Sequence, residues 1–492
     1  MTAVLLAPPA SARLAEDLRR LIGADKVLTD PAQLRTYECD GLATFRTRPG
    51  VVVLASTRDD VVQTIRLCAA AGVPFVARGS GTGLSGGAMP IAEGVLIVLT
   101  RLRKIVSVDP DNQRVVVEPG VINLWVTREA APHNQAYAPD PSSQQICSIG
   151  GNVAENAGGA HCLKYGFTVN HVMGAEVVLS SGEVVHLGGS APEHPGYDLL
   201  GAFIGSEGTL GVTTEVTLRT VRVPESVQTM LVGFRSVEDA AGAVSDIIAA
   251  GILPAAIEMM DALAIEAAEA AVKCGYPAGA VAVLVIELDG PQVEVDAQFA
   301  QVEALSQARH AFETRIARDA AERALMWKGR KSAFAAVGRI SPAYYVQDGV
   351  IPRTKLPEVL AGIARLATEA NVRVANVFHA GDGNLHPLIL FDDAVPGAAH
   401  AAEELGFAIL DLCIEAGGSI TGEHGVGVEK KSKMSAQFTP EDLDTMQLVR
   451  CAFDPDGLAN PGKLFPTPRL CGERPGVYTA ADTHDPALGD VF

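Results

Sequence analysis

The sequence lacks the clustered cysteines that an iron–sulfur cluster or a structural zinc site requires. Its eight cysteines are scattered over 492 residues, and no two of them form a Cys-x-x-Cys pair. Both kinds of site need several thiolates close together, and disulfide scaffolds carry cysteine at a higher density. We therefore expect mostly buried, reduced thiols and no cluster in this chain to carry single electrons.

Long apolar runs and an excess of basic residues are also missing. No run of about 20 uncharged apolar residues occurs, and the N-terminus lacks the early basic residues of a secretory signal. The formal net charge is −19, from 39 basic and 58 acidic side chains, which argues against nucleic acid as a ligand. We expect a cytoplasmic protein that could sit on the inner membrane through a partner.

Short apolar runs alternate with helical patterns along the first half of the chain. After a helix at 13–23, strands at 51–55 and 74–77 flank a helix at 58–71, and the second strand runs directly into a glycine-rich loop. This order is typical of an α/β nucleotide-binding lobe.

After Pro224 the glycine-rich loops disappear, and regular strand and helix patterns follow until about residue 416. A chain of this length exceeds what one hydrophobic core usually serves. We predict a cofactor domain over 1–225, a substrate domain over 226–415, a segment over 416–466 that returns to the first domain, and a polar tail over 467–492.

The loop Arg78 to Ala88, RGSGTGLSGGA, has the composition of a phosphate-binding loop. Its glycines allow close approach of a ligand, and its N–H groups can point inward as a cradle. The alternative is a flexible surface turn. The loop is neither a Walker loop nor a GxGxxG fingerprint that opens a helix, which disfavours NAD in a Rossmann fold.

Two further stretches share this character, at 139–166 and 205–216. Loops so long and so rich in glycine would be a liability unless a bound group filled the space they line. Three such stretches in one lobe indicate a single large ligand with a pyrophosphate and a planar ring.

A fourth constellation consists of His379, His386, Glu423 and His424. The segment from 372 to 391 reads as strand, Gly-Asp-Gly turn and strand, so a hairpin would bring the first two histidines together. Two imidazoles and a carboxylate are a common ligand set for a catalytic divalent metal. The alternatives are two structural histidines, and a His424 that only orients Glu423.

The segments quoted so far, together with YECDGL (37–42), VGRISPAYYVQDG (337–349) and GEHGVG (422–427), carry a family resemblance. From about Tyr37 to Lys463 the chain resembles FAD-linked oxidases of the vanillyl-alcohol oxidase (PCMH) type. It is most similar to the flavoprotein subunits of glycolate oxidases, with D-lactate and D-2-hydroxyglutarate dehydrogenases as more distant relatives.

The resemblance implies an α+β fold, with a two-lobed PCMH-type FAD-binding domain and an α+β substrate (cap) domain built on a mainly antiparallel sheet. It implies non-covalent FAD, because the nearest relatives bind it so, although Cys147 and His161 lie in the second stretch. The residues expected at the cofactor are Arg78, Gly79, Ser80, Gly81, Thr82, Gly83, Leu84, Ser85, Gly86, Gly87, Pro139, Ser142, Ser143, Gly150, Gly151, Asn152, Glu207, Gly208, Val212 and Asn460.

The implied activity is oxidation of a small 2-hydroxy acid by hydride transfer to the flavin, with glycolate preferred and D-lactate as the alternative. His379, His386 and Glu423 would hold the metal, Zn²⁺ before Mn²⁺ or Fe²⁺, and His424 would be the general base. Phe334 and Val346 replace the Thr and Lys of relatives that use dicarboxylates, so a monocarboxylate is expected.

Arg330 is the candidate for the substrate carboxylate, because a guanidinium grips a carboxylate at two points. The alternative is a solvated helix face, since lysines stand beside it. Electrons would pass to a quinone or to partners, expected to be a second FAD-type subunit and an iron–sulfur subunit. Two other classes stay open: a flavin-free metallohydrolase and a non-enzymatic subunit with vestigial loops.

Overall fold

The computed structural model describes residues 10–191 and 196–466, so the predicted polar tail lies outside the described residues. The chain forms two compact units. The first contains the described residues of 1–157, 167–222 and 424–492, and the second contains 158–166 and 223–423. The sequence placed the main boundary near residue 225 and the C-terminal return near 416, and it assigned 158–166 to the cofactor domain.

The short segment 158–166 belongs to the second unit because its polar side chains bind there. His161 lies 3.1 Å from a carboxylate oxygen of Glu287, and the Tyr165 hydroxyl donates to Asp289 at 2.6 Å. Lys164 also pairs with Asp289. The second glycine-rich stretch is therefore divided between the two units, which its composition could not reveal.

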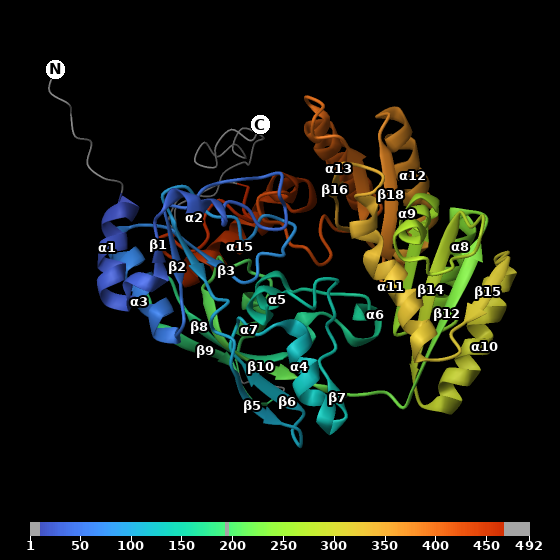
Figure 1. The fold of residues 1–492 in the computed structure, drawn as a ribbon, viewed down its shortest axis with the longest axis horizontal. Helices are drawn as coiled ribbons and strands as arrows, with labels where there is room; N and C mark the ends of the chain where they lie inside the picture. The colour runs from blue at the N-terminus through green and yellow to red at the C-terminus, as the bar shows by residue number, and fades with distance from the viewer. Residues whose placement is uncertain (1–9, 192–195, 467–492) are drawn as a thin grey trace. The chain divides into compact units, whose positions relative to one another are not determined.

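In the first unit, a four-stranded sheet carries the first glycine-rich loop. The strand order is β1-β2-β4-β3, and β2, β4 and β3 run parallel (Figure 1). Helix α3 starts at a Thr57 capping box and ends at Gly72, whose φ of 63° lies in the left-handed region that glycine favours. The elements are α1 (Ala10–Ile22), β1 (Val27–Leu28), α2 (Pro31–Arg35), β2 (Val51–Leu54), α3 (Arg58–Ala71), β3 (Phe75–Arg78) and β4 (Val95–Val98).

A five-stranded antiparallel sheet follows in the same unit, in the order β5-β6-β10-β8-β9. The hairpin of β8 and β9 turns at Gly182, whose φ is 80°. The elements are β5 (Ile105–Asp109), β6 (Arg114–Val117), α4 (Asn123–Ala130), β7 (Gln135–Ala136), α5 (Ile149–Glu155), β8 (Val172–Val178), β9 (Val184–Gly188), α7 (Leu199–Phe203), β10 (Val212–Arg219) and β11 (Val221–Arg222), with α14 (Met434–Gln437) and α15 (Pro440–Phe453) near the C-terminus.

The second unit is built on a nine-stranded antiparallel sheet, whose main path is β15-β12-β14-β13-β18-β19-β17. Strands β16 and β20 pair with each other, and β20 also pairs with β18. The strands are β12 (Ser226–Phe234), β13 (Ala256–Asp261), β14 (Ala282–Gly290), β15 (Glu313–Ile316), β16 (Ala343–Val346), β17 (Gly349–Val350), β18 (Arg373–His379), β19 (Asn384–Leu385) and β20 (Pro387–Phe391).

Helices cover both faces of this sheet, and for that reason its central strands are buried along almost their whole length. Alternate residues of β14, such as Val283 and Val285, join one core cluster with side chains of α9 and α11. On the other side, α8, α10, α12 and α13 pack next to one another. The helices are α6 (Cys162–Tyr165), α8 (Val237–Ala249), α9 (Ala262–Val272), α10 (Gln292–Ala308), α11 (Ala320–Val337), α12 (Leu356–Glu369) and α13 (Ala398–Glu415).

One predicted element is wrong in a way that concerns the site. The sequence predicted a single strand at 385–391, whereas the chain forms β19 and β20 with His386 between them. His379 pairs with Asn384 and Asn376 pairs with Pro387 in one register, so the ladder is interrupted at His386 and continues beyond it without a shift. No helix of the described residues is long and apolar enough to cross a membrane.

Candidate functional site

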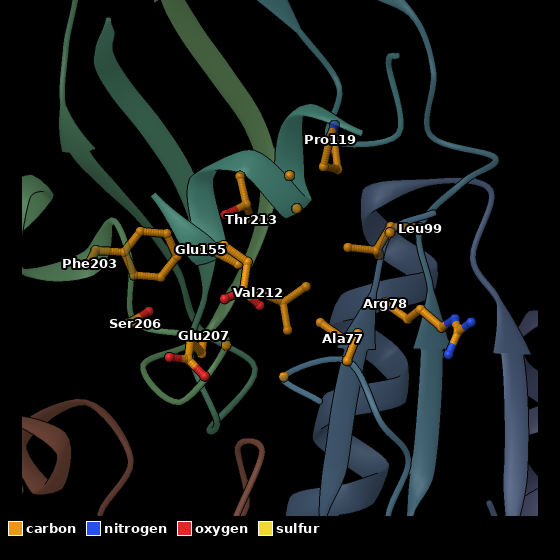
Figure 2. A pocket seen from close by; sticks show the side chains of 18 residues that line it. Ala77, Arg78, Leu99, Pro119, Glu155, Phe203, Ser206, Glu207, Val212 and Thr213 are labelled. Atoms are coloured by element: carbon orange, nitrogen blue, oxygen red, sulfur yellow. The ribbon is translucent and has the colours of Figure 1, made fainter. Parts of the chain in front are cut away.

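The first unit contains a pocket to which all three glycine-rich stretches contribute, and Figure 2 shows it closely. Glu155, Ser206 and Glu207 lie on one side in this view, and Arg78 lies on the other. Its lining residues are Ala77, Arg78, Gly79, Gly87, Ala88, Leu99, Pro119, Gly150, Gly151, Ala154, Glu155, Phe203, Ser206, Glu207, Gly208, Gly211, Val212 and Thr213.

The first glycine-rich loop offers backbone donors to a ligand. None of the N–H groups of residues 79–87 donates a hydrogen bond to any described residue. Gly79 must be glycine, because a Cβ there would lie 2.1 Å from the Ser148 hydroxyl oxygen. These N–H groups are available as donors to phosphate oxygens, and Gly79 and Gly87 bring the loop into the pocket lining.

Several buried polar atoms of the same unit also lack a partner among the described residues. They are the hydroxyls of Ser85, Ser148 and Ser206 and the Oε2 atom of Glu155. An unpaired buried polar group costs about 1–3 kcal/mol, so an isolated chain would not keep four of them together without a polar ligand. These atoms and the N–H cradle fit the pyrophosphate and the polar ring edge of FAD.

The C-terminal segment closes this unit by holding two loops together. Asn460 donates its amide to the carbonyl oxygens of Gly87 and Glu207, at 2.9 and 2.6 Å. Lys463 is fully buried and donates to the Met89 carbonyl oxygen at 2.8 Å. Burial lowers the pKa of Lys463 to about 8, although nearby carboxylates oppose that shift.

The structure brings some of the predicted cofactor residues into this pocket and leaves others outside its lining. Asn152 is bound to Asn123, and the Arg78 guanidinium donates to the Cys39 carbonyl oxygen. Those in the lining are Arg78, Gly79, Gly87, Gly150, Gly151, Glu207, Gly208 and Val212; those outside it are Ser80, Gly81, Thr82, Gly83, Leu84, Ser85, Gly86, Pro139, Ser142, Ser143, Asn152 and Asn460.

The second unit brings the three predicted metal ligands together. The Glu423 Oε1 atom lies 3.2 Å from His379 Nε2 and 3.4 Å from His386 Nε2, and the ring centroids of the histidines are 5.1 Å apart. The three side chains form one group whose ligand atoms could reach a single ion. Of the three, the two imidazoles are buried and the carboxylate is partly open.

Asp348 is a further acidic neighbour, which the sequence reasoning missed. Its Oδ1 atom lies 3.5 Å from His386 Nε2. Its other oxygen accepts hydrogen bonds from the Thr421 hydroxyl at 2.6 Å and the Gly422 N–H at 2.9 Å. Asp348 thus fixes the backbone that presents Glu423.

His379 is oriented from behind by Glu258. The Nδ1 atom of His379 lies 2.7 Å from Glu258 Oε1, which directs Nε2 toward Glu423. Arg330 then pairs with the other Glu258 oxygen at 2.6 Å. A carboxylate behind a ligand histidine fixes its tautomer and orientation, as in many metal centres. Glu258 therefore belongs to the site, although the sequence gave no sign of it.

Arg330 is 2% exposed, so the alternative of a solvated helix face is wrong. The pairing with Glu258 gives the guanidinium a role inside the second unit. Whether it also binds a substrate carboxylate stays a prediction.

The electrostatics of this group favour a cation. Burial alone would lower the pKa of His379, but Glu258 and Glu423 outweigh it and hold that pKa well above its usual range. Burial raises the pKa of Asp382, in the turn after β18, to about 6. Buried carboxylates surrounding two imidazoles leave negative charge to be compensated, which a divalent ion would do.

His424 directly follows Glu423 and begins the last part of the chain that belongs to the first unit. The residues after it bind within that unit: the Glu207 carboxylate accepts the N–H groups of Val426 and Gly427 at 2.7 and 2.6 Å. The boundary between the two units therefore falls at the peptide bond between Glu423, a predicted metal ligand, and His424.

Glu258→Gln is expected to lower metal affinity about 10-fold to 100-fold, the usual cost of losing the partner behind a ligand histidine. The amide cannot accept from His379 and pair with Arg330 as a carboxylate does. Metal content after dialysis against graded chelator measures the effect, and Glu266→Gln, an exposed position on α9, is the control. Unchanged affinity in Glu258→Gln would remove Glu258 from the site.

Comparisons with known proteins agree with both units. Residues 49–188 match the family described as an FAD binding domain, and residues 223–464 match the family of FAD linked oxidases, C-terminal domain. The chain is 53% identical over 456 residues to the glycolate oxidase subunit GlcD of Escherichia coli K12, covering 93% of this chain and 91% of that protein.

More distant relatives are similar over nearly the same length. GlcD of Bacillus subtilis is 36% identical, with 92% of this chain and 96% of that protein covered. A D-lactate dehydrogenase of Anaerostipes hadrus is 32% identical, with 91% and 94% covered.

Among solved structures, the 4-ethylphenol oxidase of Gulosibacter chungangensis aligns with a TM-score of 0.78 at 18% identity, covering 94% of this chain and 99% of that one. A p-cresol methylhydroxylase aligns at 0.77 and 17%, covering 94% and 98%. At such identity the likeness shows the fold, which is the expected PCMH-type α+β architecture.

Proposed function

We propose that this chain, which belongs to the FAD-linked oxidases, oxidises a small 2-hydroxy acid to the 2-oxo acid, with glycolate as the preferred substrate. The observation that carries the proposal is the group of His379, His386 and Glu423 in a chain whose other unit has a pocket lined by all three glycine-rich stretches. The high identity to a glycolate oxidase subunit supports the choice of substrate.

In this reaction the substrate loses a hydride from C2 and a proton from its hydroxyl. Bound FAD supplies the hydride acceptor, and a divalent cation would supply Lewis acidity at the hydroxyl. His424 takes the hydroxyl proton as general base, a role that suits a neutral imidazole near neutral pH. Both electrons and the proton are then accounted for, and the product is the 2-oxo acid.

His379, His386 and Glu423 would hold the cation. Two imidazoles and one carboxylate leave positions open for substrate oxygens, which is usual for catalytic Zn²⁺. The same set also suits Fe²⁺, and Mn²⁺ accepts it too. We propose Zn²⁺ first and the other two as alternatives.

Phe334 and Val346 support a small monocarboxylate. The Phe334 ring lies 6.0 Å from the His386 ring, centroid to centroid, and Val346 is buried at the end of β16. Neither side chain can pair with a second carboxylate, so a dicarboxylate such as 2-hydroxyglutarate would leave that group unpaired. Glycolate and D-lactate differ by one methyl group, worth about 1–3 kcal/mol, and both remain candidates.

The partners are proposed from the same reasoning. Six cysteines form no disulfide bond, and no cysteine joins a possible metal-ligating group within the described residues, so we place the one-electron carrier in a partner. A second FAD-type subunit and an iron–sulfur subunit would pass the electrons to a quinone. Full quinone reduction by this chain alone would contradict that part of the proposal.

Anaerobic mixing of the purified chain with glycolate is expected to bleach the flavin absorption. D-Lactate should reduce the flavin no faster than glycolate does. L-Lactate and 2-hydroxyglutarate should reduce it at least about 10-fold more slowly than glycolate, because a wrong configuration or an unpaired carboxylate costs more than about 1.4 kcal/mol. Chelator treatment should abolish the bleaching, and added Zn²⁺ should restore it.

Each rival class predicts a different result in the same experiment. A colourless protein without flavin would favour the metallohydrolase. A yellow protein that no 2-hydroxy acid reduces would favour a subunit with vestigial loops. Bleaching that survives complete removal of metal would overturn the role given to the three ligands.

A further inference from the structure

Glu155 is an ionisable residue of the cofactor pocket that neither the sequence reasoning nor the family resemblance had assigned. It ends helix α5 and lines the pocket next to Ser206 and Glu207 (Figure 2). A Cβ on Gly87 would lie 2.5 Å from its Oε1 atom, and a Cβ on Gly425 would lie 2.3 Å from its Oε2 atom. The carboxyl thus occupies the space that a Cβ would take at either glycine.

The carboxyl of Glu155 is placed where a negative charge is poorly supported. Its Oε2 atom is inaccessible to solvent and has no hydrogen-bond partner among the described residues. Glu207 stands beside it and takes two backbone N–H groups, from Val426 and Gly427, for its own carboxylate. Burial raises the pKa of Glu207 as well, but these two N–H groups and the nearby Lys463 oppose that shift, so Glu207 is the better supported anion of the two.

The surrounding charges do not change this balance. Glu207 and Asp40 face Glu155 with like charge, and the buried Lys463 and Lys430 oppose them. His424 precedes Gly425 in the chain. Burial is the main cause that raises the pKa of Glu155 well above its usual range, followed by Glu207 and Asp40.

A cofactor with a pyrophosphate adds further negative charge to this pocket. An ionised Glu155 would repel it, and because the Oε2 atom is inaccessible to solvent, water would screen that repulsion poorly. A protonated carboxyl, in contrast, has an O–H group to donate and needs an acceptor, and FAD offers acceptors along its whole length.

We propose that Glu155 binds FAD as a neutral carboxylic acid that donates a hydrogen bond to the cofactor. The inference rests on FAD binding in this pocket and not on which acid the enzyme oxidises. A proton stays on Glu155 in the holoprotein, and in apoprotein at higher pH it is taken up from solvent as FAD binds. Glu155 is then a cofactor-binding residue whose hydrogen bond to FAD requires that its own carboxyl is protonated.

The first test compares FAD affinity in three variants of the full chain, measured by quenching of flavin fluorescence at neutral pH. Glu155→Gln keeps a neutral donor and should hold FAD within about threefold of the parent. Glu155→Ala loses one hydrogen bond and should bind about 5-fold to 10-fold more weakly. Glu129→Gln, at an exposed position of α4, should match the parent.

The second test detects the proton itself. At neutral pH the infrared spectrum of the holoprotein should contain the carbonyl stretching band of a protonated carboxylic acid, which Glu155→Gln removes and Glu129→Gln retains. If the Gln variant lost FAD as severely as the Ala variant, or left the infrared spectrum unchanged, Glu155 would be an anionic or a structural residue and the proposal would be overturned.

The apoprotein gives a readout that is independent of the cofactor. A carboxyl whose pKa is raised in the folded state binds more protons there than in the unfolded chain. The free energy of unfolding should therefore fall as pH rises from about 4.5 through the raised folded-state pKa, and Glu155→Gln should flatten that slope. An identical slope in parent and variant would contradict the proposal even if neither bound FAD.

Discussion

Replacing His424 by alanine is expected to slow reduction of the flavin by substrate about 10²-fold to 10⁴-fold, the usual contribution of a general base. Alanine cannot accept the hydroxyl proton, so the hydride would have to leave an alcohol that keeps its proton. The residues that bind FAD in the first unit are untouched, so the variant should remain yellow. Stopped-flow absorbance under anaerobic conditions measures the rate.

Two controls separate this role from a merely structural one. His186→Ala removes an exposed histidine of β9 in the same unit and should leave the rate unchanged. Added imidazole should restore part of the rate in His424→Ala, because it can enter the space and accept the proton. If His424→Ala lost metal instead and recovered full speed on metal addition, His424 would only orient Glu423.

In the first unit, the glycine-rich loops are the part of the candidate site that could be predicted from the sequence alone. Glycine where Gly79 and Gly87 stand is informative by itself, because residues without Cβ in a loop after a strand allow a ligand close to the backbone. Glu155 and Ser206 gave no such signal. Their place in the pocket depends on where α5 and the loop before β10 meet, which local patterns do not encode.

In the second unit the sequence predicted the three possible metal ligands but not the residues that orient them. The hairpin after residue 372 predicted that His379 and His386 would meet, since it needs only local pairing. Glu258 lies directly opposite His379 because β13 pairs with β18, across 121 positions of sequence. A long-range register of this kind could not be deduced, and for that reason Arg330 was assigned without its partner.

The contact between Arg330 and Glu258 gives two possible interpretations of an Arg330 variant. If Arg330 binds the substrate carboxylate, Arg330→Lys should raise the KM and leave metal content intact. If it serves through Glu258, the same change should weaken metal binding together with the turnover rate, because Lys cannot reproduce the planar guanidinium contact. Measuring the rate against substrate concentration at saturating metal distinguishes these two roles of Arg330. The result shows whether the substrate site includes this residue.

Removing a metal ligand should have the other large effect. His379→Ala takes away the imidazole that Glu258 orients and leaves His386 and Glu423 as the remaining two of the three ligands. A divalent ion held by two protein ligands dissociates far more readily than one held by three. At micromolar total metal, the metal content of the variant should therefore fall below about a tenth of that of the parent. The rate of flavin reduction should fall with it, by at least about 10²-fold, since the hydroxyl would lose its Lewis acid.

The pattern of recovery makes this result specific to a ligand. Millimolar Zn²⁺ should restore part of the rate in His379→Ala, because weak binding can be driven by mass action, whereas His424→Ala should not respond to metal at all. His310→Ala, an exposed position of the same unit, should keep its metal. Full metal content and a full rate in His379→Ala would contradict the ligand role. The imidazole, Glu258 and Arg330 would then form a buried ion-pair chain that only stabilises the fold, because breaking such a chain lowers stability without changing the reaction.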